Sequence, residues 1–214
     1  TAVRKRLTDL LPNRKLFSTA LKLGQTFKSI LPKSVASKVV DSRPAGEWPA
    51  PRHARKMLTL QGCVQPALSP DINAATARVL DRLGISLIVA TGVGCCGAVS
   101  QHLSEPEQAR EQMRRNIDAW WPYLSDKIEA IITTASGCGS MLKDYAFHFR
   151  DDYDYLIKAE RIAYLSRDIV EIIHREPYST LVKHSTDTKK VAWHAPCSLQ
   201  HGQKITGMVE TILT

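Results

Sequence analysis

The residues of this chain best suited to chemistry are its five cysteines. Cys63 stands alone, Cys95 and Cys96 are adjacent, and Cys138 and Cys197 follow further along the chain. Thiolates are soft ligands that suit iron–sulfur clusters, zinc and copper(I). Four thiolates on converging loops match the ligand set of an iron–sulfur cluster or of a tetrahedral zinc ion. An odd number of cysteines in 214 residues does not indicate a disulfide scaffold, so the cysteines predict a metal centre.

Glycines accompany these cysteines. Gly92, Gly94 and Gly97 surround the adjacent pair, and they allow the sharp backbone turn through which neighbouring cysteines reach one centre. The glycines that flank Cys63 and Cys138 are Gly62, Gly137 and Gly139. Two other interpretations stay open: the cysteines are buried and pack as small hydrophobic side chains, or they hold a structural zinc ion.

The elements that must position the cysteines alternate between strand and helix. Apolar runs predict strands at 57–60, 85–90, 130–135 and 190–193. Helical patterns lie between them, at 70–83, 104–121, from about 140, and at 159–174. Ser69 and Ser104 are expected to cap the first two of these helices. This order is typical of an α/β fold with a parallel, doubly wound (Rossmann-like) sheet and flanking helices.

A cysteine follows each predicted strand within about five residues. Because ligands bind outside the carboxyl ends of strands in such sheets, we expect the metal centre at that edge. The spacing from Lys56 to Cys63 is repeated from Lys190 to Cys197. This weak internal repeat predicts that Cys197 is the first cysteine of a second unit.

The pattern divides the chain into four segments. Residues 1–40 form a basic amphipathic helical segment, 41–54 a proline-rich linker, 55–185 the first cysteine-rich domain, and 186–214 the truncated start of a second one. The net charge of +8 resides at the N-terminal end, because residues 1–60 hold 13 Lys and Arg against 3 Asp and Glu. The basic character therefore does not belong to the cysteine-rich body.

The sequence also limits location and partners. No apolar run approaches the roughly 20 residues that a spanning helix needs, and no signal peptide is recognised. Free thiols then favour a reducing, cytoplasmic protein. The basic amphipathic segment leaves two roles open: packing against partner domains or subunits, and peripheral contact with the anionic inner face of the cell membrane. Nucleic-acid binding is not expected, because no recognition motif accompanies the charge.

Five runs of sequence carry a resemblance to a known family. They are GCVQPALSPDINAATARVLDRLGI, GCCGAVSQHL, NIDAWWP, TASGCGSM and HAPCSLQHGQKI. Across essentially the whole chain, these runs closely resemble the iron–sulfur subunits of glycolate oxidase (glycolate dehydrogenase). Those subunits belong to a larger group that shares the cysteine-rich CCG domain.

The resemblance implies a ligand set. By motif, Cys63 matches the family's lone first cysteine, Cys95 and Cys96 match its pair, and Cys138 matches the first cysteine of a closing CxxC. Met141 occupies the last position of that CxxC, and a thioether is a poor cluster ligand. The four remaining cysteines still suffice for one iron–sulfur cluster of the 4Fe-4S type.

The resemblance also implies an electron-transfer function. In such a complex, a partner subunit carrying FAD oxidises glycolate, a 2-hydroxy acid, and electrons pass through the iron–sulfur subunit toward the quinone pool. This chain would be a subunit of an oxidoreductase without catalytic residues of its own. Cys197 would begin the metal ligands of a second CCG domain, and without the family's ferredoxin-type domain we expect a fragment. The alternative is a structural zinc- or thiol-binding scaffold of the same complex.

Overall fold

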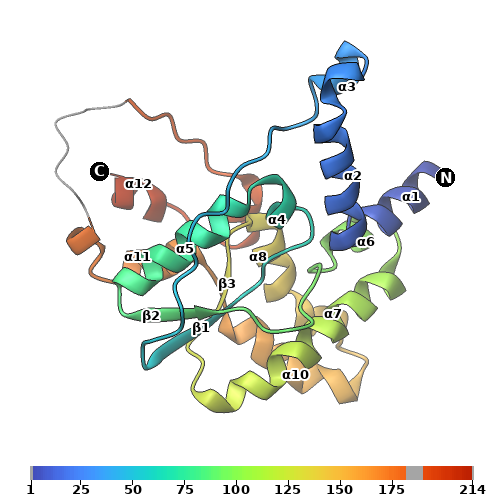
Figure 1. The fold of residues 1–214 in the computed structure, drawn as a ribbon. Helices are drawn as coiled ribbons and strands as arrows, with labels where there is room; N and C mark the ends of the chain where they lie inside the picture. The colour runs from blue at the N-terminus through green and yellow to red at the C-terminus, as the bar shows by residue number, and fades with distance from the viewer. Residues whose placement is uncertain (1, 182–189, 214) are drawn as a thin grey trace.

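A four-stranded parallel sheet forms the centre of the molecule (Figure 1). The computed structural model describes residues 2–181 and 190–213. The strands are β1 (Arg55–Thr59), β2 (Ile85–Ile88), β3 (Ile131–Thr133) and β4 (Ser166–Asp168). Their order is β2-β1-β3-β4, and every neighbouring pair is parallel. The prediction of a parallel α/β sheet is confirmed.

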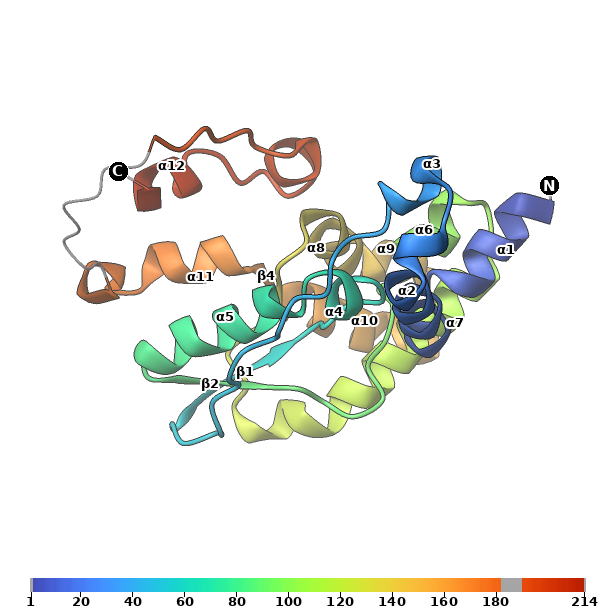
Figure 2. The ribbon, with the colours of Figure 1, turned by 45° about the horizontal axis from the view of Figure 1, so that its top comes forward.

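Helices cover both faces of this sheet (Figure 2). On one face, α7 (Pro106–Trp120) and α10 (Tyr153–Leu165) pack against Leu58 and Ile131. On the other, α5 (Pro70–Arg82) and α11 (Ile169–Arg175) pack against strand residues that include Met57 and Ile132. Neighbouring strand residues thus point to opposite, equally apolar faces, which explains the continuous hydrophobic runs in the sequence.

Shorter helices complete the body and the C-terminal end. They are α4 (Gln65–Leu68), α6 (Ala98–His102), η2 (Trp121–Asp126), α8 (Ser136–Lys143), α9 (Tyr145–His148), η3 (Tyr178–Leu181), η4 (Ser198–Gly202) and α12 (Met208–Leu213). No helix in the described part of the chain is long and apolar enough to cross a membrane.

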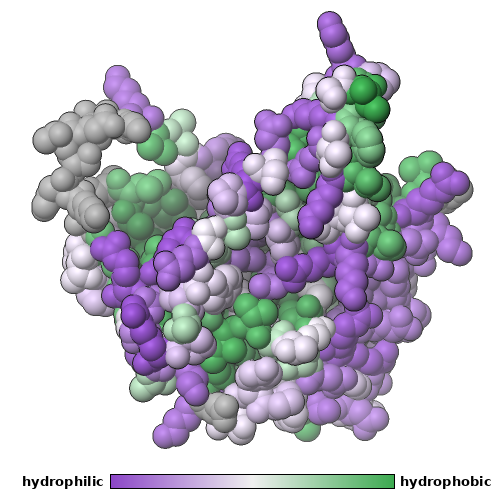
Figure 3. Space-filling view, in the orientation of Figure 1, coloured by the Kyte–Doolittle hydropathy of each residue, from purple (hydrophilic) through white to green (hydrophobic). Residues whose placement is uncertain are grey.

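The N-terminal segment is a helical arm that extends from the body (Figures 1 and 2). It contains α1 (Ala2–Leu10), α2 (Arg14–Thr26), η1 (Lys28–Ile30) and α3 (Lys33–Ala36), and residues 41–53 then run without regular structure to β1. Apolar side chains with more than half of their surface exposed follow one side of α2 and η1: Leu16, Leu23 and Ile30. Figure 3 shows hydrophobic residues along this arm among strongly hydrophilic ones. The helical prediction is confirmed.

Two predicted elements at the C-terminal side are wrong. The helix expected at 159–174 is two helices, because α10 ends at Leu165 and β4 follows. Asp168, the last residue of β4, then caps the N-terminus of α11 through a capping box with Glu171. The single apolar pattern in the sequence therefore contains a three-residue strand. The strand expected at 190–193 is exposed irregular chain, and β4 occupies the place beside β3.

Smaller differences concern helix starts. Helix α8 begins at Ser136, earlier than expected, which places Cys138 inside its first turn. Ser69 precedes α5 as predicted, but its side chain makes no capping hydrogen bond, and Glu105 takes the cap position of α7 in place of Ser104. In both helices proline at the first position removes one unpaired N–H group. The predicted domain boundary between 185 and 186 lies outside the described residues.

Candidate metal centre

Three loops at the carboxyl edge of the sheet bring four cysteines together. Cys63 follows β1, Cys95 and Cys96 follow β2, and Cys138 follows β3 in the first turn of α8. The first three side chains are buried and the fourth is half-buried. Because β1 lies between β2 and β3, these three loops are neighbours, and the order of the strands produces the cluster of thiols.

The four thiols form a continuous chain of contacts. The thiols of Cys63 and Cys95, and those of Cys95 and Cys96, lie close enough to shift one another's pKa. Cys96 donates to Cys138, with 3.3 Å between the sulfur atoms. No disulfide joins them, since all are free cysteines. The structure therefore gathers the four residues that the sequence singled out for one centre.

These contacts keep the thiols protonated when no cation is bound. The hydrogen bond to Cys95, followed by burial, raises the pKa of Cys63 far above its usual range. The pKa of Cys95 rises to about 11, because its bond to Cys96 and its burial outweigh the lowering effect of the bond from Cys63. The bond to Cys138 raises the pKa of Cys96 in the same direction. A bound cation must displace these protons, so metal binding is expected to strengthen as pH rises.

Backbone N–H groups also point at the sulfur atoms. The amide of Val64 hydrogen-bonds to the sulfur of Cys63, that of Gly97 to Cys95, and that of Ala98 to Cys96. Each of these bonds lowers the pKa of its thiol, which means that it stabilises the thiolate form. Such donors around sulfur are the kind of environment that tunes a thiolate-bound metal.

Two buried side chains fix the backbone of the cysteine pair. Asn116 of α7 accepts a hydrogen bond from Gly94 N (2.8 Å) and donates to Cys95 O (2.7 Å). Tyr145 donates from its hydroxyl to Cys96 O (2.9 Å), and Asn116 donates to that hydroxyl (3.2 Å). Both residues are completely buried. Sequence reasoning assigned them no role, although Asn116 begins the NIDAWWP run, where a polar residue precedes apolar ones.

Gly97 permits the turn that follows the pair. Its φ of +97° lies in the left-handed region, and a Cβ atom there would lie 3.0 Å from Met113 Cε and 3.2 Å from Ala109 O. Left-handed backbone and close packing on α7 therefore both require glycine at this position.

Gly97→Ala is expected to destabilise the protein by about 2–4 kcal/mol, because backbone strain and overpacking add. Gly84→Ala is the matched control, since Gly84 has a φ of +78° but nothing within 4 Å of its Cβ position. Strain alone should cost the control about 1 kcal/mol. Urea denaturation of both variants measures the difference, and equal losses would show that packing against α7 does not matter.

A polar network supports the Cys63 loop. Gln65 donates to Asn73 (2.9 Å) and to Thr134 (2.6 Å), and Asn73 donates to Gln61 O (3.2 Å). A pocket of about 90 Å³ opens beside this network, lined by Cys63 and Cys138 among other residues. The loop after β1 is thus tied to the loop after β3, with two of the cysteines facing one cavity.

Met141 and Cys197 are not members of this group of four thiols. Met141 is buried in the same apolar core cluster as Cys96. Cys197 is exposed and follows irregular chain rather than a strand. The expectation that every cysteine follows a strand therefore holds for the first three loops and is wrong for Cys197.

Four soft thiols, those of Cys63, Cys95, Cys96 and Cys138, form the donor set of this site. A cluster holds several irons, so its cysteine ligands need not converge on one atom. Four soft thiols in series, with amide donors around them, fit such a cluster.

Fold and cysteines together define the class of this protein. Residues 57–143 match the family model described as CCG, cysteine-rich domain, and this segment of the chain belongs to that family. Across 99% of its length it is 43% identical to the glycolate oxidase iron-sulfur subunit of Escherichia coli (strain K12), covering 52% of that protein.

More distant relatives share part of this similarity. The chain is 25% identical over 149 residues to the probable glycolate oxidase iron-sulfur subunit of Bacillus subtilis (strain 168), which covers 70% of this chain and 33% of that protein. It is 24% identical over 152 residues to lactate utilization protein A of Bacillus licheniformis, which covers 69% of this chain and 58% of that protein. The chain thus spans about half of the E. coli relative and a third of the B. subtilis one. No solved structure matches it significantly.

Proposed function

We propose that this chain is the iron–sulfur electron-transfer part of a glycolate-oxidising complex. The observation that carries the proposal is the grouping of the four thiols of Cys63, Cys95, Cys96 and Cys138 at the carboxyl edge of the sheet. These four residues would hold one cluster of the 4Fe-4S type, and when bound that cluster supplies a reversible one-electron redox couple. The protein's own part is to position the thiols, bury them and surround them with amide donors.

The rest of the pathway belongs to partners. A subunit carrying FAD would oxidise glycolate or a related 2-hydroxy acid, and the electrons would pass through this chain toward quinone. The names of the relatives support this assignment, because they include iron-sulfur subunits of glycolate oxidase and a lactate utilization protein. We assign no catalytic residue to this chain, and Cys197 would ligate metal only within a second CCG domain.

The N-terminal arm is the part of the chain proposed to contact those partners. Its exposed apolar side chains, Leu16, Leu23 and Ile30, suit packing against another subunit. Lysines and arginines share the arm, so peripheral contact with the anionic inner face of the cell membrane is the second proposed use. Either contact would place the protein in the cytoplasm, at or near the membrane that contains quinone.

Anaerobic purification with metal analysis tests the function. We expect a coloured protein that contains iron and acid-labile sulfide in equal amounts and loses its colour on reduction. A colourless protein with one zinc per chain would overturn the proposal and establish the zinc scaffold. In a second measurement, the fully reduced, metal-free protein is reconstituted with iron and sulfide, and its cluster content is determined. This control excludes the explanation that a cluster was lost during purification.

A further inference from the structure

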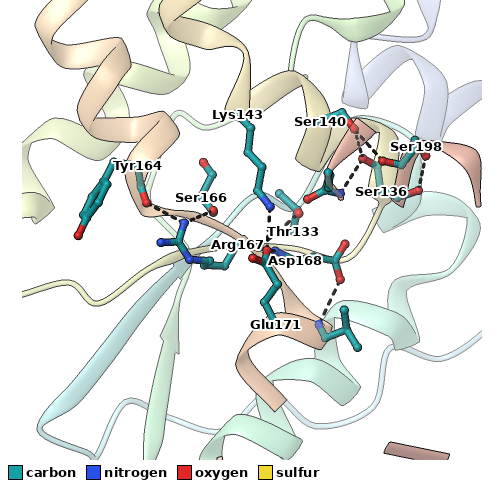
Figure 4. Close-up of polar contacts among 12 residues, drawn as sticks. Thr133, Ser136, Ser140, Lys143, Tyr164, Ser166, Arg167, Asp168, Glu171 and Ser198 are labelled. Atoms are coloured by element: carbon teal, nitrogen blue, oxygen red, sulfur yellow. Dashed lines mark hydrogen bonds and ion pairs between the residues drawn. The ribbon is translucent and has the colours of Figure 1, made fainter. Parts of the chain in front are cut away.

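A turn from the C-terminal end of the chain packs on the helix that carries Cys138 (Figure 4). This turn, here called the C-terminal turn, consists of residues 198–203. The hydroxyl groups of Ser198 and Ser136 are 2.6 Å apart and share a hydrogen bond. Ser140 donates to Ser198 O (3.1 Å), and Gln203 donates from Nε2 to Ser136 O (3.0 Å). Three hydrogen bonds therefore join the C-terminal turn to the start of α8.

Glycines on both sides make this contact unusually close. A Cβ atom on Gly139 of α8 would lie 2.5 Å from Gln203 Nε2 and 2.8 Å from Thr133 Oγ1. A Cβ atom on Gly202 would lie 2.6 Å from Ser140 Oγ. Neither position has room for a side chain, so the backbone at Gly139 packs directly on the Gln203 side chain and the backbone at Gly202 packs directly on the Ser140 side chain.

The C-terminal turn is itself anchored to the body. Leu199 and Ile205 are buried and form an apolar cluster with Val170 of α11. Gln203 is also buried and hydrogen-bonds to Asp168, the residue that begins α11. These contacts connect the turn to β4 and α11, so that it holds α8 against a fixed part of the fold.

Helix α8 is thus held at both ends. At its C-terminal end, Lys143 forms an ion pair with Glu171 of α11 (2.9 Å), as Figure 4 shows. At its N-terminal end, the contacts from the C-terminal turn fall on Ser136 and Ser140. Cys138 lies midway between these two serines. The position of its sulfur relative to Cys96, 3.3 Å away, therefore depends on how firmly this turn of helix is held.

We propose that Ser198 and Gln203 are positioning residues of the first metal centre, which they serve by fixing the α8 turn that presents Cys138. The C-terminal turn then belongs functionally to the first cysteine-rich unit, although the sequence pattern assigned it to a second one. The first part of this proposal, that the two residues fix the position of the Cys138 thiol, concerns the metal-free protein. The second part, that they thereby affect the redox properties of a bound cluster, deepens the proposed function and rests on it.

Thiol reactivity in the metal-free, reduced protein tests the first part. We expect Ser198→Ala and Gln203→Met each to raise the rate of iodoacetamide alkylation at Cys138 about fivefold, the effect of losing one hydrogen bond to the start of α8. The rate at Cys63 should stay unchanged. Mass spectrometry of the digested protein measures both sites. Gln200→Ala is the matched control, because Gln200 lies in the same turn and no side-chain hydrogen bond joins it to α8 in the described part of the chain.

Conservative replacement and spectroscopy test the second part. Ser198→Thr keeps the hydroxyl group and should restore the slow alkylation of Cys138. After reconstitution with iron and sulfide, Ser198→Ala should shift the midpoint potential and the electron paramagnetic resonance signal, whereas Ser198→Thr and Gln200→Ala should not.

The outcomes separate this proposal from the proposed function. Unchanged alkylation of Cys138 in both variants, or an equal increase at every cysteine, would overturn the positioning role. An unchanged potential and spectrum in Ser198→Ala would overturn its redox consequence. Selective exposure of Cys138 together with failure of the wild-type protein to take up any cluster would support the positioning role and overturn the proposed function.

Discussion

Replacing any one of Cys63, Cys95, Cys96 and Cys138 with serine is expected to abolish stable binding of an iron–sulfur cluster. Serine keeps the size of the side chain but removes the soft thiolate that iron requires. The remaining cysteine, Cys197, is exposed and outside this group, so the centre has no spare thiol. We expect each variant to retain less than about a tenth of the wild-type iron, because losing even an outer-shell partner typically costs 10–100-fold in affinity.

Iron and sulfide analysis after reconstitution measures this loss, and Cys197→Ser is the control. Cys197 is exposed and lies outside the chain of thiols, so its replacement should leave the cluster content unchanged. Circular dichroism of the metal-free variants shows whether they fold. If Cys197 proved necessary while one of the other four did not, the proposed ligand set would be wrong.

The assembly of the four cysteines could be predicted because each depends on local sequence. β1, β2 and β3 are each a short apolar strand that is followed by a glycine and then by a cysteine. The rule that parallel strands present their carboxyl ends at one edge then brings the three loops together. No long-range information is needed beyond this rule, so the spacing of Cys63, Cys95 and Cys138 is informative even in a single sequence.

The parts that were missed depend on contacts between distant segments. β4 has only Ser166, Arg167 and Asp168, which carry no apolar strand pattern, and its identity follows from pairing with β3. The 190–193 run is apolar in places, yet no strand in the described part of the chain pairs with it. Likewise, nothing near Asn116 in the sequence indicates that its amide will reach the backbone of a loop that precedes it by some 20 residues.

Asn116→Ala is expected to be the most damaging substitution outside the cysteines. Asn116 is completely buried, and its amide satisfies Gly94 N, Cys95 O and the Tyr145 hydroxyl. Removing it leaves the partners without their bonds, at about 1–3 kcal/mol for each buried group, and also opens a cavity. We expect a loss of about 3–5 kcal/mol, a large share of the 5–15 kcal/mol that stabilises a typical domain. Urea denaturation of the metal-free, reduced protein measures it.

Two further variants show whether the loss acts on the cysteine pair. Tyr145→Phe keeps the ring in the core and removes the hydroxyl, with its hydrogen bond to Cys96 O and the one it accepts from Asn116. It should cost about 1–2 kcal/mol and speed alkylation of Cys95 and Cys96. Ser166→Ala also removes one buried hydrogen bond, from its hydroxyl to Ile162 O, in a strand that carries no cysteine. It should cost about 1 kcal/mol and leave the alkylation rates unchanged.

Asn116→Ala should lose more stability and speed alkylation more than either variant, because it alone releases the backbone on both sides of the Gly94–Cys95 peptide. An Asn116 variant no worse than Ser166→Ala would mean that the pair keeps its geometry through its own turn and through Gly97.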